Sequence, residues 1–250
     1  MKKLFCVALT IASAAASAQA PPNYPLPTGK DRVHLVDVAQ MPLPLPKAEL
    51  LKMQSTMTKA DDGFSGASKS SELVRQFFNN LEVVKGQQPL SAQEAEAMAE
   101  KMQHGKEIPT APLVVRNITD LKVGFAPAAV RTGKLIGAAP QGTIVNGTWT
   151  GVERYFELTG GYSRVSETDM AASGGMFFMN RAAVNTNVAG KPAISMVYTD
   201  ERGTRLEEVL WVNGGKLFKV TYAPNLNQGR YGMMKANPGV SALSLATELR

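Results

Sequence analysis

The stretch between residues 192 and 222 constrains the fold more than any other part of this chain. It contains three runs rich in β-branched, aromatic and other apolar residues, separated by the turn signals Asp200-Glu201-Arg202-Gly203 and Asn213-Gly214-Gly215. This alternation of apolar runs and turn formers is typical of an antiparallel meander. A chain with such a meander places at least three paired strands in one sheet, so we interpret the remaining sequence around that sheet.

The second turn signal predicts the register of its hairpin. Asn-Gly suits a type I′ turn, which needs positive φ at two consecutive residues and whose twist matches that of paired strands. With Asn213 and Gly214 as a two-residue loop, Trp211 lies opposite Lys216, and four large residues share one face of the hairpin. A loop that is one residue longer would place these residues on both faces. These four residues are Val209, Trp211, Phe218 and Val220. The other face is mixed in character, so we expect a sheet with one strongly apolar side and one partly covered side.

The N-terminus has the pattern of a secretory signal peptide. A short basic region precedes an apolar run over residues 4–11 and then a run of small residues. The apolar run is too short to span a bilayer. We place the cleavage after Ala18, because the competing site would leave Pro21 directly behind the cut. The sequence therefore predicts residues 1–18 as a signal peptide and a periplasmic or secreted protein without a transmembrane span after cleavage.

Cysteine and charge exclude several classes of function. Cys6 is the only cysteine and lies inside the signal peptide, so the mature chain has no disulfide, thiol nucleophile, thiolate metal site or iron–sulfur cluster. The chain has 27 basic and 21 acidic residues, and removal of Lys2 and Lys3 leaves 25 against 21, a formal charge of +4. This excess is mild and no basic run reaches five residues, which argues against nucleic acid as a partner.

Residues 19–46 are predicted to form a proline-rich extended arm or linker. Seven prolines lie between Pro21 and Pro46, ending in Met-Pro-Leu-Pro-Leu-Pro. Proline fixes φ near the polyproline value and keeps its preceding neighbour extended. Three interpretations remain open: a tether without function, a docking segment for an aromatic groove on a partner, and an arm laid across the protein's own sheet.

Residues 47–108 are predicted to form a helical segment of two or three helices. Apolar residues recur at helical spacing over residues 70–85, after a run of turn formers over residues 61–68. Ser91-Ala92-Gln93-Glu94 matches a capping box, in which the serine and the glutamate each satisfy a free N–H at the helix start. The helix that it opens is expected to run to about His104.

Residues 109–250 are predicted to form an antiparallel β domain, with 47–250 as one folded unit. We interpret residues 126–140 as irregular because they are rich in alanine, glycine and proline. Residues 240–249 fit either a closing helix or a strand. Besides the meander, the expected strands are 113–115, 118–125, 143–145, 148–158, 162–166 and 176–184. The predicted class is α+β, with N-terminal helices packed on a C-terminal, largely antiparallel sheet that forms a meander or an open half-barrel.

Few residues offer catalytic chemistry. A serine triad would need His34 or His104 as its base, and no serine lies in a complete nucleophile elbow. The remaining catalytic candidates are Glu153 and Glu157, which share one face of a strand but lie roughly 13 Å apart, too far for a glycosidase pair. Their convergence with Glu208 in one pocket would favour a hydrolase, whereas exposure to solvent would fit charged residues that protect a strand edge.

Methionine is the one unusual count, with 12 residues. Met98 and Met102 form an i,i+4 pair next to His104, and thioethers are soft ligands for Cu(I). These three residues are the metal candidates that we retain, although an i,i+4 methionine pair is also typical of an adaptable helix core, and a histidine at a helix C-terminus favours the helix dipole. The sequence predicts no cofactor.

Together these features favour a non-enzymatic exported binding or accessory protein. It would act through a β-sheet surface or through the proline-rich arm, with an envelope protein or a peptide as its partner. The alternatives are a carboxylate-dependent hydrolase of the cell envelope and a methionine-based copper-binding protein. The sequence leaves the oligomeric state open.

Overall fold

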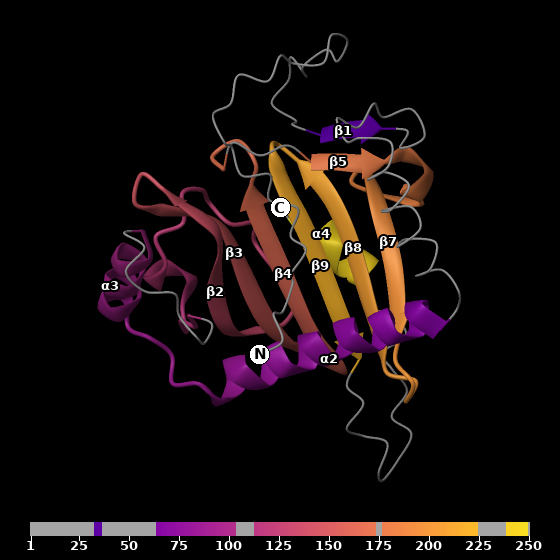
Figure 1. The fold of residues 1–250 in the computed structure, drawn as a ribbon, viewed down its shortest axis with the longest axis horizontal. Coiled ribbons are helices and arrows are strands. Elements are labelled where there is room, and N and C mark those ends of the chain that lie inside the picture. Colours follow the sequence, from indigo (N-terminus) through magenta and orange to yellow (C-terminus); the bar gives the residue numbers. More distant parts are fainter. Residues whose placement is uncertain (1–32, 37–63, 104–112, 174–176, 225–238, 250) are drawn as a thin grey trace, which may run out of the picture.

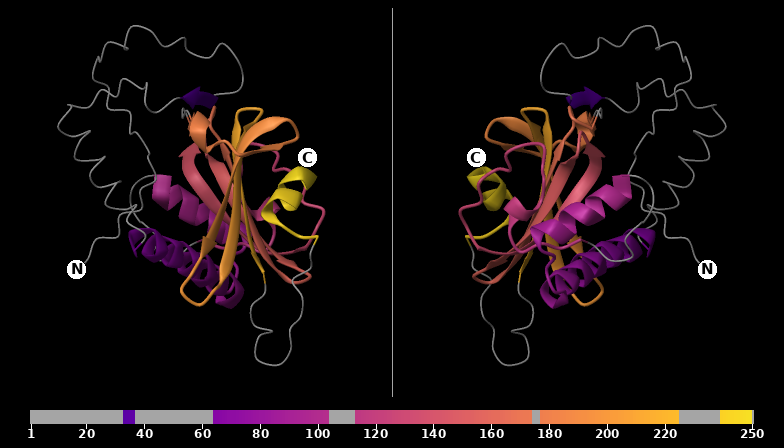
Figure 2. Two further views of the ribbon diagram at one scale, coloured as in Figure 1. Left: turned by 90° about the vertical axis from the view of Figure 1, so that its right-hand side faces the viewer. Right: turned by 90° about the vertical axis from the view of Figure 1, so that its left-hand side faces the viewer.

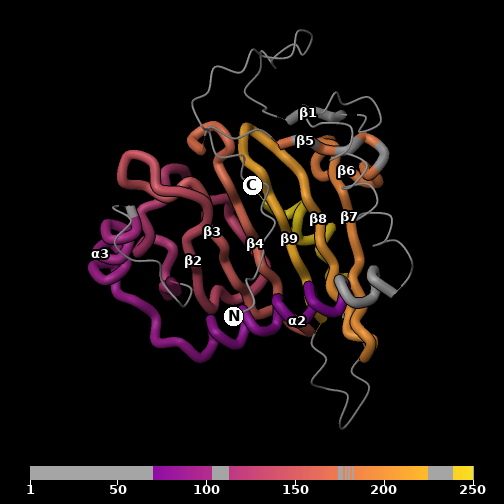
Figure 3. The backbone as a smooth tube through the Cα atoms, viewed as in Figure 1, coloured from indigo at the N-terminus to yellow at the C-terminus, as the bar shows by residue number. Residues whose placement is uncertain are grey.

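A seven-stranded antiparallel sheet forms the centre of the computed structural model, which describes residues 33–36, 64–103, 113–173, 177–224 and 239–249 (Figure 1). The strand order is β2-β3-β4-β9-β8-β7-β6. The strands are β2 Lys134–Val145, β3 Thr148–Leu158, β4 Gly161–Asp169, β6 Thr186–Val188, β7 Lys191–Thr199, β8 Arg205–Asn213 and β9 Lys216–Pro224. The tube in Figure 3 shows two runs of successive hairpins, β2 to β4 and β6 to β9, that meet where β4 pairs with β9.

Three α-helices of the described residues accompany this sheet: α2 Phe64–Gly86, α3 Ala92–Gln103 and α4 Ala242–Glu248. A separate parallel pair joins β1 Val33–Val36 to β5 Phe177–Asn180. The expected α+β class, with helices preceding an open antiparallel sheet, is confirmed. Among the described helices, none has both the length and the apolar character needed to cross a membrane.

A different helix packs on each face of the sheet, and we name each face after its helix. Helix α2 crosses one face from β7 to β2, whereas α4 packs on the opposite face against β8, β9 and β6 (Figures 1 and 2). We call these the α2 face and the α4 face. Since side chains alternate along a strand, every strand contributes to both faces.

The α4 face holds the main apolar core. Trp211 and Phe218 stack there, with ring centroids 5.0 Å apart and an angle of 12° between the ring planes. The sequence analysis placed both residues on one apolar face with Val209 and Val220, and this is confirmed. The other buried members of this core are Phe156, Leu158, Val165, Val188, Ala193, Tyr222, Ala242, Leu245 and Ala246.

The predicted register of the β8–β9 hairpin is wrong by two residues. Asn213 pairs with Lys216 and Trp211 pairs with Phe218, so the loop consists of Gly214 and Gly215. Their φ angles are 60° and 79°, which glycine adopts at no steric cost, and Asn213 remains the last residue of β8. The loop has the predicted length, and a shift of two residues keeps every side chain on its face.

Helix α2 buries the apolar stripe that its periodicity predicts. The buried residues of the helix are Val74, Phe77, Leu81 and Val84. They contact Tyr155, Leu206 and Ala223 of the α2 face. The helix begins at Phe64, so the prediction of a turn over residues 61–68 is wrong from Phe64 onward. Local helix propensity is a weak preference, and packing of the long amphipathic helix against the sheet overrides it.

Other helix predictions hold with shifted ends. At the start of α3, the backbone N–H of Ser91 donates to Glu94 at 2.8 Å and the N–H of Glu94 donates to Ser91 Oγ at 3.3 Å, which confirms the capping box. The helix ends at Gln103, and His104 lies outside the described residues. The closing segment is a helix, α4, capped in the same reciprocal way by Ser241.

The sequence analysis misread the chain around β2. A 3-10 helix, Ile118–Asp120, lies where residues 118–125 were expected to form a strand. Strand β2 begins at Lys134, inside the stretch 126–140 that was expected to be irregular. β2 is an edge strand with two register irregularities, which is where a sheet accepts proline and glycine.

The predicted strand 176–184 is divided in the structure. β5 covers only Phe177–Asn180, leaves the main sheet and pairs with β1. A 3-10 helix, Arg181–Ala183, then leads to β6. Because β1 belongs to the proline-rich arm, part of that arm pairs with its own protein.

Candidate functional site

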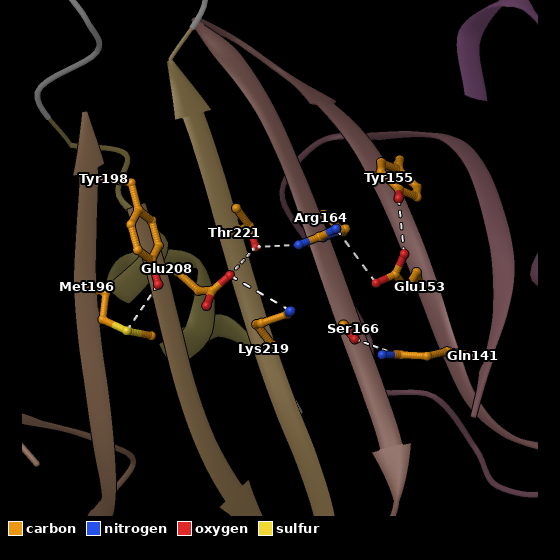
Figure 4. A network of polar contacts seen from close by, with 10 residues as sticks. All are labelled: Gln141, Glu153, Tyr155, Arg164, Ser166, Met196, Tyr198, Glu208, Lys219 and Thr221. Atoms are coloured by element: carbon orange, nitrogen blue, oxygen red, sulfur yellow. Dashed lines mark hydrogen bonds and ion pairs between the residues drawn. The ribbon is translucent and has the colours of Figure 1, made fainter. Parts of the chain in front are cut away.

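A network of polar side chains extends across the α2 face (Figure 4). It begins at the strip where α2 packs, since Tyr155 contacts the buried residues of α2, and it extends beyond that strip, where no other described helix covers it (Figure 1). We call this set the polar network, and its members are Gln141, Glu153, Tyr155, Arg164, Ser166, Met196, Tyr198, Glu208, Lys219 and Thr221.

Strand register brings these residues together from distant parts of the sequence. One row of directly opposed residues crosses five strands and consists of Tyr155, Arg164, Thr221, Glu208 and Met196. The next row on the same face lies two residues further along each strand and consists of Glu153, Ser166, Lys219, Leu210 and Ile194. Cross-strand neighbours on one face are close enough to interact, so the rows form a continuous surface.

The contacts that link the charged residues of the polar network are long. Arg164 Nη1 lies 3.8 Å from Glu153 Oε1, and Lys219 Nζ lies 3.9 Å from Glu208 Oε2. Between these pairs, Arg164 donates to Thr221 Oγ1 at 3.4 Å, and Thr221 donates to Glu208 at 3.3 Å. Charge-assisted hydrogen bonds in proteins are usually about 2.7–2.9 Å long. The four charges are therefore arranged in complementary positions but are held loosely.

Arg164 is the most constrained charge of the network. Its side chain is only 13% exposed and its guanidinium lies 5.8 Å from the ring centroid of Phe77 in α2. Burial alone would lower the pKa of Arg164, but the attraction of the carboxylates of Glu153 and Glu208 and the interaction with Tyr155 outweigh it and raise the pKa. The buried Nε of Arg164 has no hydrogen-bond partner among the described residues. A buried cation with one unused donor is a place where a further acceptor would be stabilised.

Two tyrosines border the charged residues. Tyr155 donates to Glu153 at 3.1 Å, and burial together with this carboxylate raises the pKa of Tyr155. Tyr198 donates to the sulfur of Met196 at 3.2 Å, and burial followed by the charge of Glu208 raises the pKa of Tyr198 to about 12. Both hydroxyls are therefore neutral donors at physiological pH.

An apolar margin adjoins the network on β7, β8 and β9. Its four members are half-buried rather than packed into a core and are Ile194, Met196, Leu210 and Leu217. Leu210 lies directly opposite Lys219, so the apolar margin and the charged residues meet in one row. The surface as a whole is amphipathic.

The structure separates the two predicted catalytic candidates. Glu153 lies in the polar network, whereas Glu157, on the same strand face, is exposed and pairs across the sheet with Tyr162. Glu208 joins Glu153 in the network, where Arg164 and Thr221 form the chain of contacts between the two carboxylates. Of the three glutamates, two therefore belong to the network and Glu157 lies in solvent.

The predicted metal candidates lie only partly within the described residues. Met98 and Met102 are half-buried on α3, and His104 is not among the described residues. The described part of the chain contains no group of three or more histidine, cysteine, aspartate or glutamate side chains that could hold a metal ion.

Sequence reasoning missed most of the polar network, including Arg164, Lys219 and Thr221. A signal existed on β9, where Lys219 and Thr221 alternate with apolar residues, but not on β4, where the neighbours of Arg164 and Ser166 are themselves partly polar. Only the pairing of β4 with β9 shows that these two polar stripes lie side by side.

The comparisons with known proteins give no independent indication of function. No protein-family model, no curated protein and no solved structure matches this chain. The function therefore has to be inferred from the physical character of the site.

Proposed function

We propose that the chain is an exported binding protein whose ligand site is formed by the polar network and the apolar margin of the α2 face. The observation that carries this proposal is the incomplete pairing of the network. Its half-buried charges lie 3.8 Å and 3.9 Å from their partners, and a buried N–H of Arg164 has no acceptor among the described residues. Buried polar groups are normally well hydrogen-bonded, and incompletely satisfied ones concentrate at functional sites.

The composition of the site indicates an amphipathic ligand. Arg164 and Lys219 are balanced by Glu153 and Glu208, so the surface has no net charge to attract a polyanion. Lys219 is 32% exposed, the most accessible charge in its ion pair, and it adjoins the apolar margin through Leu210. A ligand with an anionic group beside Lys219 and an apolar body along the margin uses both halves of the surface.

A dye that shares this chemistry tests the site. We expect anilinonaphthalene sulfonate, which is anionic and apolar, to bind saturably to the mature protein with an increase in fluorescence. Lys219→Gln should raise its dissociation constant about fivefold, which corresponds to about 1 kcal/mol. Lys134→Gln, an exposed lysine at the edge of the sheet on β2, is the matched control and should leave the constant unchanged.

Two further titrations separate the halves of the site. Leu217→Ala should weaken binding of the same dye, because it removes apolar contact from the margin. A neutral apolar dye should lose affinity in Leu217→Ala but not in Lys219→Gln. Equal affinity of the sulfonate for the wild type and for both variants would refute the proposed site.

Export is proposed on the composition of residues 1–18. The mature protein should begin at Gln19, because a short apolar run and a small-residue cleavage site precede it. Intact-mass spectrometry of the protein recovered from a periplasmic or culture fraction measures this directly. A cytosolic protein that retains residues 1–18 would contradict export without affecting the binding site.

A further inference from the structure

Strand β7 forms an open edge of the sheet over its second half. β6 pairs only with its first three residues, ending at the pair Thr186 and Ala193. From Ile194 to Thr199, the ladder with β8 is the only strand pairing that the described residues provide. Among the described strands, β6 thus covers this side of β7 at its start, and none pairs with it there at its end.

The side chain of Asn185 shows which way the backbone of this edge points. Its Nδ2 donates to the carbonyl of Ser195 at 2.8 Å, and its Oδ1 accepts the N–H of Ser195, also at 2.8 Å. The side-chain amide of Asn185 thus forms the two hydrogen bonds that a neighbouring strand would otherwise form with Ser195. In an antiparallel ladder, alternate residues direct both backbone groups to the same side. The N–H and C=O of Val197 and Thr199 therefore also point away from β8.

Within the described part of the chain, the edge beyond Asn185 lacks the usual protection. Natural edge strands are guarded by charged residues, proline, bulges or covering elements. Between Ala193 and Thr199 the sequence has no charged residue and no proline. Val197 is 53% exposed, the one large apolar side chain of the described chain that is clearly exposed. Outside the ladder with β8, neither Val197 nor Thr199 makes a backbone hydrogen bond to another described residue.

An open groove lies next to the end of this edge. It has a volume of about 680 Å³ and is lined by residues of α2, by the β7–β8 loop from Asp200, directly after Thr199, and by Tyr162. Phe78 and Tyr162 contribute apolar surface to it, and charged residues of both signs line it, among them Glu72, Arg75, Asp200 and Arg202.

We propose that the edge from Val197 to Thr199 is a docking site for an extended peptide segment of a partner protein, which adds a strand to β7. The two outward-facing residues offer about four backbone hydrogen bonds, and strand addition of this kind obtains its affinity from such bonds. The residue facing Val197 should be uncharged and β-branched, because such pairs are favourable on a pleated surface.

The geometry favours a peptide over a second copy of this chain. A stable interface buries about 800 Å² on each partner, which a two-residue edge does not supply by itself. A peptide that continues past Thr199 reaches the groove and adds contacts there. A second β7 instead turns back at its own hairpin after Thr199 and leaves the groove empty. This site is separate from the polar network, so either one can fail its test without the other.

Hydrogen–deuterium exchange with a synthetic peptide tests the docking site. The probe is a blocked peptide of alternating threonine and valine with two terminal lysines for solubility, added to the full mature protein. At saturation, exchange at the amides of Val197 and Thr199 should slow about tenfold, as for other amides that enter a ladder. Val197→Pro removes one outward N–H, which an edge strand tolerates, and should abolish this protection and the binding of labelled peptide.

Two variants complete the design. Val197→Thr keeps the β-branched shape and both backbone groups, so it should bind the peptide like the wild type. Asn185→Ala exposes the backbone of Ser195 and should tighten peptide binding, with new protection at Ser195. The Asn185→Ala variant tests the docking site even if Val197→Pro destabilises the protein and lowers its thermal midpoint.

Three results would overturn the proposal. The first is peptide binding that Val197→Pro leaves unchanged. The second is an Asn185→Ala protein that gains no affinity and no protection. The third is a dimer of the wild type, measured by sedimentation, that Val197→Pro converts to a monomer, because the edge would then serve a second copy.

Discussion

Replacing Trp211 with alanine should lower the free energy of unfolding by about 3–5 kcal/mol, the usual cost of truncating a large aromatic residue in a core. The side chain is 3% exposed and stacks on Phe218 across the β8–β9 hairpin. Its removal therefore takes away a large buried apolar surface and leaves a cavity beneath α4. Denaturant titration followed by far-ultraviolet circular dichroism measures the change.

Val197→Ala provides the matched control, because Val197 also lies on a strand of this sheet but is 53% exposed. That substitution should change the free energy of unfolding by less than about 0.5 kcal/mol. A Trp211→Ala protein with the denaturation midpoint and slope of the wild type would show that the α4 face is not the main core.

Replacing Glu167 with alanine should destabilise the protein to a similar extent, by about 3–5 kcal/mol. Glu167 is fully buried on the α4 face, where it pairs with Arg154 and accepts the backbone N–H of Ala128. Burial raises the pKa of Glu167 and lowers the pKa of Arg154, so each charge depends on the other. Without Glu167, a buried guanidinium loses its counter-charge and the segment at Ala128 loses an anchor.

Two further variants identify the origin of this effect. The double variant Arg154→Met with Glu167→Leu should recover most of the lost stability, because it removes both charges at nearly constant volume. Glu96→Ala, which breaks an exposed ion pair with Lys122, should cost less than about 1 kcal/mol. Equal denaturation midpoints for Glu167→Ala and Glu96→Ala would contradict a role for burial.

The sequence predicted those elements whose signals are local. Strand β3 has the predicted bounds, the α3 capping box forms as expected, and the apolar face around Trp211 is confirmed. These features depend on neighbours within a few residues. Only residues 143–145 of β2 were predicted as a strand, because Pro140 and Gly142 are read locally as loop residues, whereas an edge strand with irregular register accommodates them.

The sequence predicted little of the candidate site, because the site depends on the pairing of strands that are distant in the sequence. Glu153 and Glu208 were considered as possible catalytic residues, but Arg164, which lies between them, was not. Its position follows from the pairing of Arg164 with Thr221, two residues from strands that are distant in the sequence. Composition and spacing along a single strand do not predict such a pairing.

The same junction between β4 and β9 has a consequence for how the protein folds. All other pairs of the main sheet join strands that are consecutive in the sequence, whereas β5 to β8 lie between these two. Closing this pair has the largest loop entropy in the sheet, so we expect it to form late. Arg164 and Thr221 meet across it. The binding surface is thus absent from either half alone, and a ligand that contacts both halves would hold the late-forming junction closed and slow unfolding.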